Sequence, residues 1–324
     1  MISVVVPLYN EAESLPTLHA ELSRVFADGS LGPAEFVFVD DGSRDSSWTA
    51  VRDIAARDGR VKALRLRRNF GKAAALTAGF QVVKGEVVLT LDGDLQDDPA
   101  EIPRFLAKLG EGLDVVSGWK RRRFDPWHKV YPSRVFNRLV STLTGCVLHD
   151  HNCGFKAYRR EVIGEVDIYG ELHRFIPVLA YARGYRVGEI EVNHRARRFG
   201  ASKYGFSRFI KGLLDLLTVR FLTRFGQRPL HVMGGVGLTL SSVGVVGLIY
   251  LAVLWLQGDR PIGTRPMLFY SVAVLIVGIQ LISLGVLAEL VTAYNLRTTD
   301  TYSIAETIGS AEPDPDPNAE APAR

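Results

Sequence analysis

Cysteine is scarce in this sequence, with 2 residues in a chain of 324. A chain with so few thiols is not one of the small secreted scaffolds that disulfides hold together. Behind Met1 there is neither a basic segment nor a small-residue cleavage site of the kind that ends a signal peptide. We therefore expect the part of the chain that precedes any membrane span to stay in the cytoplasm.

Several nucleotide-binding signatures are also missing. The sequence has no G-x-x-x-x-G-K-[ST] phosphate loop, and no G-x-G-x-x-G follows its first predicted strand, which argues against a kinase, an ATPase or a dehydrogenase. Without zinc-finger spacing, a basic helix or an aromatic ribonucleoprotein motif, nucleic acid is not an expected partner. The segment His149–Cys153 lacks a paired C-x-x-C and favours a loop with one functional carboxylate over a zinc site.

Apolar sequence, in contrast, is plentiful. Hydrophobic residues make up 47% of the chain and charged residues 23%, which excludes a disordered chain. Val232–Leu256 and Met267–Ala288 are free of charged residues over 25 and 22 positions, and a membrane-spanning helix needs about 20. The short link between them predicts a two-span hairpin. Basic residues on its outer flanks favour both ends in the cytoplasm: Arg220, Arg224, Arg228 and Arg297.

The first 120 residues alternate between short β-branched runs and helical patterns. This rhythm predicts an α/β fold with a mostly parallel sheet and helices on both faces. The predicted strands are Ile2–Val6, Glu35–Val39, Val61–Leu66, Glu86–Leu91 and Leu113–Ser117. The predicted helices between them include Glu11–Phe26, Ser46–Arg57 and Pro99–Leu109.

The later part of the chain has a different pattern. Residues 131–145 and 205–228 mix basic and bulky apolar side chains, and we expect two amphipathic helices at the membrane interface. An ordinary surface helix packed on the core is the alternative. We predict a catalytic domain over residues 1–228, a membrane hairpin over 229–296 and a disordered acidic cytoplasmic tail over 297–324.

Polar residues cluster directly after each predicted strand. In an open α/β sheet, ligands bind outside the carboxyl ends of the strands, so these clusters together indicate one site. Asp92-Gly93-Asp94 is the sharpest of them, because two carboxylates so close at a strand end repel each other unless a cation is present. Their hard oxygen atoms, with Gln96, suit Mg²⁺ or Mn²⁺. Asp97 and Asp98 are predicted to cap the helix that begins at Pro99.

Six segments of the sequence are distinctive: VVVPLYNEAESL, FVDDGSRDSS, RNFGKAAALTAG, LDGDLQDDP, HNCGFKAYRREV and RRFGASKYG. In these segments the sequence resembles the family 2 glycosyltransferases of GT-A fold, and more closely their polyprenyl-phosphate branch. That branch includes dolichol-phosphate mannose synthases and bacterial undecaprenyl-phosphate glycosyltransferases. The resemblance covers about residues 1–230 together with the paired spans.

The resemblance implies a role for each matching residue. The nucleotide-sugar donor would be bound by Pro7, Tyr9, Glu11, Val39, Asp41, Lys72 and Gly93. The divalent metal would be held by Asp92, Asp94 and Gln96. Phosphates of acceptor or donor would be held by Lys120, Arg134, Arg197 and Lys203, and Asp150 would be a loop carboxylate near the acceptor. The basic run Lys120–Arg123 leaves open which residue holds the acceptor phosphate.

The expected reaction moves a sugar from a nucleotide-sugar, with UDP-glucose as the best guess, to undecaprenyl or another polyprenyl phosphate. It would be metal-dependent, would invert the anomeric carbon, and would take place at the bacterial inner membrane. Alternatives are a GDP-mannose-dependent mannose synthase and a non-catalytic nucleotide-sugar-binding anchor. A processive polysaccharide synthase would need a Q-x-x-R-W motif that the sequence lacks. The glycines of the first span would allow contact with further copies, so we expect a homo-oligomer.

Overall fold

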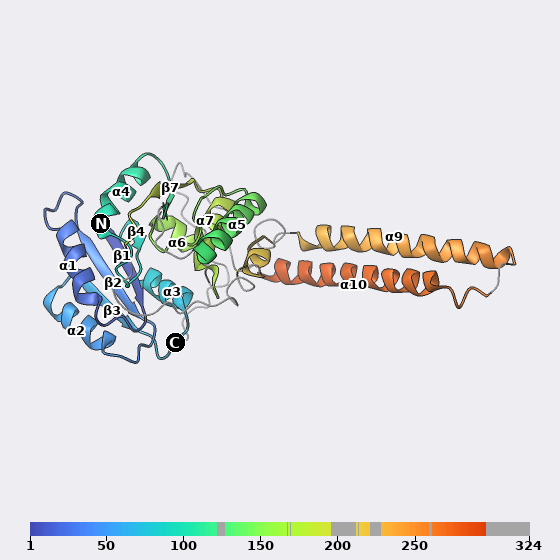
Figure 1. Cartoon of the computed structure of the whole chain (residues 1–324), viewed down its shortest axis with the longest axis horizontal. Helices are drawn as coiled ribbons and strands as arrows, with labels where there is room; N and C mark the ends of the chain where they lie inside the picture. The colour runs from blue at the N-terminus through green and yellow to red at the C-terminus, as the bar shows by residue number, and fades with distance from the viewer. Residues whose placement is uncertain are drawn as a thin grey trace, which may run out of the picture.

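The structure, a computed structural model, describes residues 1–121, 127–166, 168, 170–195, 212, 214–220, 228–258 and 261–295. It combines an α/β part with a long helical hairpin that extends away from it (Figure 1). Predicted site residues Arg197 and Lys203 lie outside the described residues, as does the predicted acidic tail.

The α/β part is built on one sheet, whose described strands follow the order β3-β2-β1-β4-β6-β5-β7. Six strands are mutually parallel where they pair, and β6 runs antiparallel between β4 and β5. The mostly parallel α/β fold predicted from the sequence is therefore confirmed. The strands are β1 (Ile2–Leu8), β2 (Ala34–Asp40), β3 (Val61–Arg65), β4 (Val87–Thr90), β5 (Val115–Trp119), β6 (Lys156–Arg159) and β7 (Val187–Glu191).

Helices cover both faces of the sheet. Along β1, Val4 and Val6 face one hydrophobic cluster and Val5 faces another, as expected for a strand buried on both sides. The first cluster includes residues of α1 (Leu15–Val25), α2 (Ser47–Arg57) and, after the 3₁₀ turn η1 (Pro99–Glu101), α4 (Ile102–Gly110). The opposite face packs against α3 (Lys72–Val82), α6 (Arg160–Glu165) and, after η2 (Leu172–Phe175), α7 (Ile176–Ala182).

A separate cluster supports α5 (Trp127–Thr144), which lies on the side of the α/β part that faces the hairpin (Figure 1). Phe136 and Val140 of α5 are buried with Leu216 and Val219 of the helical residues 214–220. Their other faces expose apolar side chains: Val135, Leu139, Leu214 and Leu217. An exposed apolar face beside a candidate membrane span is consistent with the predicted interfacial position, which stays a prediction.

The hairpin consists of α9 (Pro229–Leu256) and α10 (Pro266–Asn295), both long and apolar enough to cross a bilayer. Gly237 and Gly244 of α9 lie directly against the backbone of α10, where a Cβ atom would come within 2.6 and 2.8 Å of α10 atoms. Small residues thus serve contact within the hairpin. The expected homo-oligomer, which these glycines suggested, stays a prediction.

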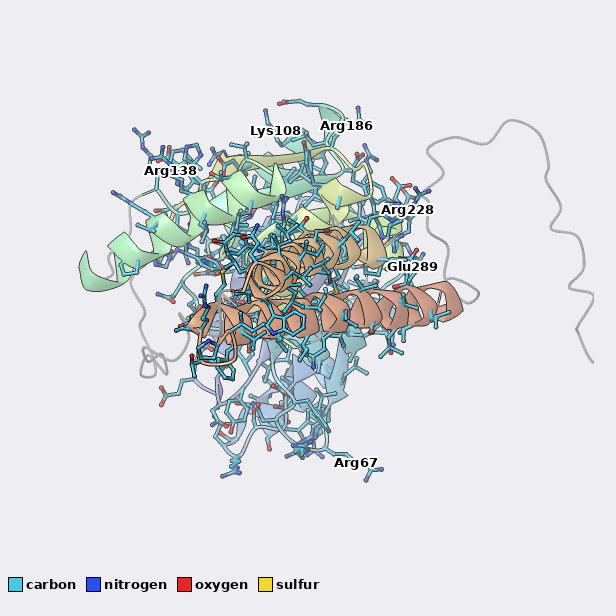
Figure 2. The ribbon with its side chains drawn as sticks, turned by 90° about the vertical axis from the view of Figure 1, so that its right-hand side faces the viewer. Arg67, Lys108, Arg138, Arg186, Arg228 and Glu289 are labelled. Atoms are coloured by element: carbon cyan, nitrogen blue, oxygen red, sulfur yellow. The ribbon has the colours of Figure 1, made fainter. Side chains whose placement is uncertain are left out.

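One acidic side chain joins the two ends of the hairpin. The Glu289 carboxylate of α10 accepts a hydrogen bond of 3.2 Å from the Leu230 backbone N–H, in the first turn of α9. Figure 2 labels this glutamate together with Arg228, which directly precedes α9. Because the first N–H groups of a helix lack intrahelical partners, Glu289 acts as a cap supplied by the neighbouring helix.

Some sequence-based boundaries were wrong. Residues 11–14 form a turn rather than the start of a helix, and α1 begins at Leu15, next to Pro16. Only Asp98 caps the turn at Pro99, by accepting a 3.0 Å hydrogen bond from the Ala100 N–H. Asp97 is instead buried and forms an ion pair elsewhere.

Candidate active site

A cavity of about 180 Å³ lies where β1, β2 and β4 end, beside the first turn of α3. We call it the strand-end cavity. Its lining residues are Pro7, Leu8, Tyr9, Glu11, Asp41, Lys72, Ala75, Asp92, Gly93 and Asp94. Most of the residues predicted to bind the donor are therefore in one place, since parallel strands carry their carboxyl ends to the same edge.

Side-chain to backbone hydrogen bonds tie the loop after β1 to the loop after β2. The Asn10 N–H donates to Ser43 Oγ at 2.9 Å, and the Arg44 N–H donates to Asn10 Oδ1 at 2.9 Å. Asn10 has a φ of 56°, a left-handed conformation that asparagine tolerates better than most residues. The Glu11 N–H donates to Ser47 Oγ at 2.8 Å. These contacts fix the loop that carries Tyr9 and Glu11 into the cavity.

Asp41 fixes the loop that leads into α3. Its two carboxylate oxygens accept hydrogen bonds from the Phe70 and Gly71 N–H groups, at 2.7 and 2.9 Å. Burial, the largest influence, raises the pKa of Asp41 despite these hydrogen bonds. Neighbouring Gly42 has a φ of 69°, and a Cβ atom there would lie 2.4 Å from the Arg68 backbone. Only glycine fits this crossing of the two loops.

The Asp92–Asp94 turn forms the acidic wall of the cavity. Ser14 Oγ donates a 2.6 Å hydrogen bond to the Gly93 carbonyl, and Leu95 has a φ of 61°, which is uncommon outside glycine. Asp92 forms an ion pair with Lys72. Burial alone would raise the pKa of Asp92, but the ammonium groups of Lys72 and Lys120 lower it to about 2. Asp92 is therefore a carboxylate at neutral pH.

Gly154, just before β6, makes room for Asp92. A Cβ atom at this position would lie 2.5 Å from Asp92 Oδ2 and 2.7 Å from its Oδ1. These separations are far shorter than a van der Waals contact, so the carboxylate could not keep its place beside any other residue. The position of Asp92 thus depends on a glycine more than sixty residues away in the chain.

The acidic wall suits a hard divalent cation. Asp92 and Asp94 present carboxylate oxygens to one cavity, and Mg²⁺ is commonly held by one or two carboxylates plus substrate phosphates and waters. Within the described residues, no group of three or more His, Cys, Asp or Glu side chains has the arrangement of a complete metal site. Gln96 is not among the residues lining the cavity. The two carboxylates therefore suit a cation that takes its remaining ligands from a substrate phosphate and from water.

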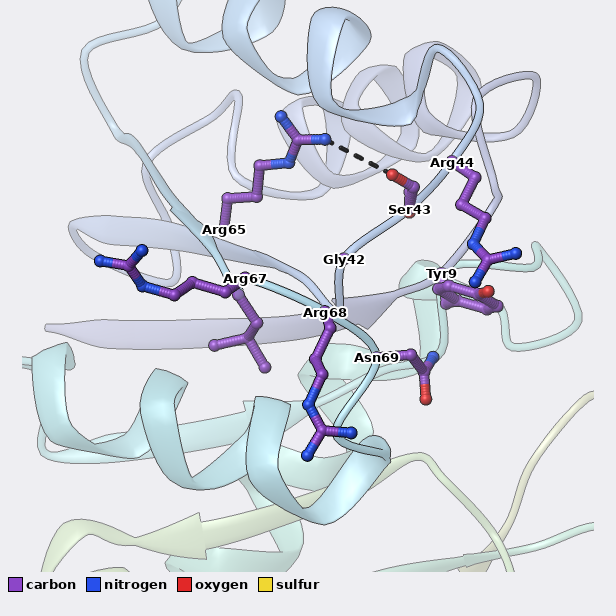
Figure 3. Close-up of a pocket in the computed structure, with 9 residues that line it drawn as sticks. Tyr9, Gly42, Ser43, Arg44, Arg65, Arg67, Arg68 and Asn69 are labelled. Carbon is purple, nitrogen blue, oxygen red and sulfur yellow. Dashed lines mark hydrogen bonds between the residues drawn. The ribbon is translucent and has the colours of Figure 1, made fainter.

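A second cavity, of about 690 Å³, continues from Tyr9 along the ends of β2 and β3 (Figure 3). We call it the arginine cavity because four arginines line it: Arg44, Arg65, Arg67 and Arg68. Gly42, Ser43 and Asn69 also contribute to its lining. Arg65 is held by Ser43 and Asp40, at 3.4 Å from each. Arg68 lies over the Phe70 ring, 4.4 Å from its centroid. The charge of this cavity favours an anionic or carbonyl-rich ligand.

A third cavity, of about 530 Å³, lies between the end of β5 and α5. We call it the α5 cavity. It is lined by Trp119, Lys120, Arg121, Arg134, Asn137, Arg138, Ser141, Val147, Leu148 and His149. The Trp119 and His149 rings stack at 4.2 Å, and Val147 is exposed. Cationic groups beside apolar surface suit a ligand with an anionic head and a hydrocarbon chain.

Lys120, directly after β5, is one of the residues that line the α5 cavity. Its ammonium lies 2.7 Å from the fully buried Asp97 carboxylate. Burial opposes the charge of Lys120, but Asp97 outweighs it and raises the pKa of this lysine. Lys120 also lowers the pKa of Asp92, so its charge reaches both cavities. Asp97, expected to be a helix cap, instead positions this lysine.

Besides Gln96, two predicted residues lie away from the cavities. Val39 is fully buried in the core beneath α3, in a strand that is paired on both sides. Asp150 is buried in the loop after α5, where it accepts a 3.1 Å hydrogen bond from the Asn152 N–H. Arg134 is exposed on α5 and faces the α5 cavity, as expected for a residue that holds a phosphate.

Sequence reasoning missed three residues near Asp92: Gly154, Lys156 and His173. Burial lowers the pKa of Lys156 to about 8, and Lys72 adds to this effect. Burial also keeps the pKa of His173 well below its usual value, with Lys72 again contributing. The motif HNCGFKAYRREV contained Gly154 and Lys156, but nothing in its spacing placed them beside a loop sixty residues earlier.

This chain is similar to several known proteins over most of its length. Residues 3–167 match the model of glycosyl transferase family 2. A dodecaprenyl-phosphate galacturonate synthase of Rhizobium johnstonii is 40% identical, over 94% of this chain and 92% of its own length. An undecaprenyl-phosphate 4-deoxy-4-formamido-L-arabinose transferase of Aeromonas hydrophila is 36% identical, over 96% of this chain and 95% of its own length.

Solved structures show the same fold at lower sequence identity. The glucosyl-3-phosphoglycerate synthase of Mycobacterium tuberculosis, in complex with Mn²⁺, UDP-glucose and phosphoglyceric acid, is 19% identical with a TM-score of 0.54. The match covers 69% of this chain and 79% of that one. At this identity the likeness establishes the fold of the catalytic part alone.

Proposed function

The chain belongs to glycosyl transferase family 2, and we propose that it transfers a sugar from a nucleotide-sugar donor to a polyprenyl phosphate at the membrane surface. The observation that carries this proposal is the presence of two unlike cavities at the carboxyl ends of the strands, one after β1, β2 and β4 and the other after β5. One is acidic and suits a metal-bound diphosphate, and the other is basic and partly apolar. Curated relatives that match nearly the whole chain are named as polyprenyl-phosphate sugar transferases.

The acceptor needs no general base in this reaction. A phosphate monoester already carries about 1.5 to 2 negative charges at neutral pH, so its oxygen is a ready nucleophile. The difficulty is that it must approach an anionic diphosphate. Lys120, Arg134 and Arg138 offset this repulsion, and Lys120 is held in place by Asp97. Attack on the anomeric carbon from the side opposite the leaving diphosphate inverts its configuration.

Asp92 and Asp94 are the proposed metal ligands, with Gln96 in the same turn. Mg²⁺ or Mn²⁺ held there would stabilise the negative charge on the departing nucleoside diphosphate. The similar fold solved with Mn²⁺ and UDP supports this assignment. Pro7, Tyr9 and Glu11 would hold the nucleoside, since all three line the strand-end cavity and Tyr9 also lines the neighbouring arginine cavity.

The identity of the donor is a finer proposal. UDP-glucose is the prediction from the sequence, whereas the relatives are named for galacturonate and for 4-deoxy-4-formamido-L-arabinose. The catalytic part is proposed to lie on the cytoplasmic side of the inner membrane, anchored by α9 and α10. Its exposed apolar face on α5 would then meet the bilayer where the acceptor phosphate lies.

The test is transfer of labelled sugar by the purified full-length chain in detergent with undecaprenyl phosphate. The donor panel contains UDP-glucose, UDP-galacturonate, UDP-4-deoxy-4-formamido-L-arabinose and GDP-mannose, each with Mg²⁺, Mn²⁺ or EDTA. We expect a metal-dependent, chloroform-extractable product from one donor. Replacing Arg134→Ala should lower the rate, chiefly through the apparent affinity for the acceptor, whereas Arg186→Ala, far from the α5 cavity, should not. Nucleotide binding without lipid product from any donor would favour the non-catalytic anchor.

A further inference from the structure

The ammonium group of Lys72 is built into the strand-end cavity by its local backbone. Asp41 accepts the N–H groups of Phe70 and Gly71, and Gly71 has a φ of 97° directly before α3. Lys72 is consequently the first residue of α3, and its side chain reaches the Asp92 carboxylate. Both side chains remain partly exposed, 29% for Lys72 and 33% for Asp92, because their contact faces the cavity.

The charges around this pair are unequal. The acidic side chains lining the cavity are those of Glu11, Asp41, Asp92 and Asp94, and within the described residues Lys72 is the one cation in the lining. Asp41 already uses both oxygens on the loop. The Lys72 ammonium forms an ion pair with the Asp92 carboxylate at the face of the cavity. The lysine therefore supplies, at this carboxylate, the positive charge that a metal would supply.

One carboxylate cannot hold an ammonium group and a divalent cation equally well, because the two cations repel each other at short distance. A donor diphosphate entering the same cavity offers Lys72 a second anionic partner. Lysine suits such an exchange, since it is a point charge on a flexible stem with rotatable donors. A guanidinium would be held more rigidly by its planar geometry.

We propose that Lys72 is a resident counter-ion of Asp92, which it releases when the donor diphosphate enters, so that metal and nucleotide bind cooperatively. This inference rests on the proposed function and deepens it. Without nucleotide, Mn²⁺ must displace the lysine and binds weakly. With nucleotide, the lysine moves to the diphosphate and leaves the Asp92 carboxylate to the metal. By thermodynamic reciprocity, the metal strengthens nucleotide binding by the same factor.

The test is Mn²⁺ affinity, measured by electron paramagnetic resonance of free Mn²⁺, with and without saturating UDP and without any acceptor. For Lys72→Met we expect Mn²⁺ without UDP to bind about tenfold more tightly than to the wild type. The strengthening by UDP should fall about tenfold. Lys72→Arg keeps the charge and should keep weak binding in the absence of UDP. Lys108→Met is the matched control, because that lysine also pairs with a carboxylate, Glu111, but lies on the surface of α4.

An unchanged or weaker Mn²⁺ affinity of folded Lys72→Met without UDP would overturn the proposal. If Lys72→Met is unstable in thermal unfolding, Lys72→Gln, which retains a polar side chain of similar reach, replaces it and should show the same tighter binding of Mn²⁺ without UDP. Sugar transfer is assayed separately. If the wild type transfers sugar but Lys72→Met shows the same strengthening of Mn²⁺ binding by UDP as the wild type, the counter-ion role of Lys72 alone is refuted. Altered coupling with no transfer from any donor refutes the proposed function instead.

Discussion

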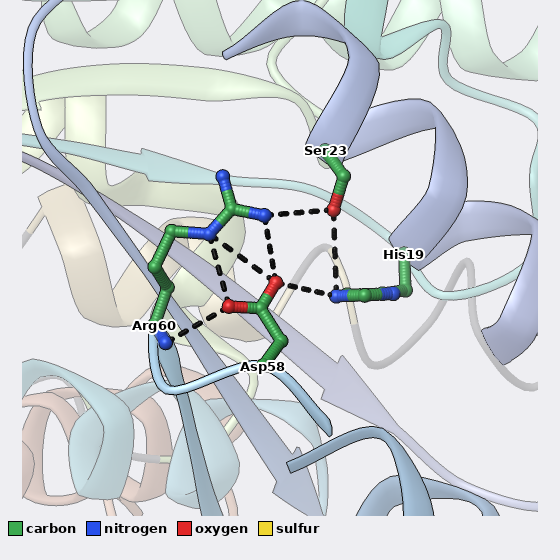
Figure 4. A network of polar contacts seen from close by, with 4 residues as sticks. All are labelled: His19, Ser23, Asp58 and Arg60. Atoms are coloured by element: carbon green, nitrogen blue, oxygen red, sulfur yellow. Dashed lines mark hydrogen bonds and ion pairs between the residues drawn. The ribbon is translucent and has the colours of Figure 1, made fainter. Parts of the chain in front are cut away.

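Two carboxylates, one at the amino ends of the strands and one at the carboxyl ends, are paired with cations in different ways. Asp58, between α2 and β3, accepts hydrogen bonds from the Arg60 backbone and guanidinium and contacts His19 Nε2 at 2.9 Å (Figure 4). Arg60 also donates to Ser23 at 3.0 Å. The guanidinium of Arg60 lowers the pKa of Asp58 far below its usual value, although burial opposes this. Asp92, in contrast, is paired with Lys72 in an open cavity.

The comparison teaches what distinguishes a structural ion pair from a functional one. Both carboxylates are ionised and both have a cationic partner, so neither charge nor pKa separates them. The difference is that Asp58 is enclosed by partners from α1 and from its own loop, whereas Asp92 has one neighbouring face open to a ligand. A partner that can be exchanged is what a binding site requires.

The largest expected effect comes from exchanging each carboxylate for an amide. Asp92→Asn should lower sugar transfer by roughly 10²–10³-fold, the range typical for removing one electrostatic stabiliser of a reaction. Asp58→Asn should act on stability instead. It should keep the rate and lose about 1–3 kcal/mol of unfolding free energy, because Arg60 keeps an incomplete partner.

Initial rates of lipid-linked sugar formation and thermal unfolding in detergent measure both sides of this exchange. The comparison fails if Asp58→Asn slows transfer without destabilising the protein. It fails equally if Asp92→Asn remains active.

Gly154→Ala should displace the Asp92 carboxylate without removing it. The new Cβ atom would overlap the Asp92 oxygens, so the carboxylate must move. A displacement of about 1 Å at a reacting centre can cost roughly 10²-fold in rate, and we expect a loss of that order together with weaker Mn²⁺ binding in the presence of UDP. The matched control is Gly164→Ala in α6, where a Cβ atom meets nothing within 4 Å. Equal activity of the two variants would show that Asp92 tolerates displacement.

The sequence predicted the half of the fold that local pattern controls. β1 to β5 are short β-branched runs buried on one or both faces, and the polar clusters after them follow from parallel strand direction. The two apolar helices follow from length and absence of charge. The start of α1 was misplaced because the chain after Asn10 is held by loop contacts with Ser43 and Ser47 rather than by helix formation.

The rest depends on contacts between distant residues. β6 has charged residues at both ends of its four positions, Lys156 and Arg159, and nothing local marks it as a central strand. Its place between β4 and β5 brings Gly154 and Lys156 to Asp92. The pairing of Asp97 with Lys120 likewise joins two loops, and the local pattern at Asp97 looked like a cap. Such partners are determined by tertiary packing and have no signature in a single sequence.

The smallest expected effect is on the pH dependence of stability, which again compares the surroundings of Asp92 with those of Asp58. Around Asp58 the charges are matched, whereas near Asp92 the buried Lys156 has a pKa lowered to about 8, compared with 10.5 for an unburied lysine. Between these values the unfolded chain binds more protons than the folded one, so stability should rise with pH, by roughly 1 kcal/mol per pH unit. Lys156→Met, which buries no charge, should flatten this rise between pH 8 and 10, whereas Lys108→Met at the surface should keep it. Unfolding midpoints in detergent across that range measure the slope. A slope unchanged in Lys156→Met would mean that Lys156 is not the buried cation responsible, and that the charges beside Asp92 are as well matched as those around Asp58.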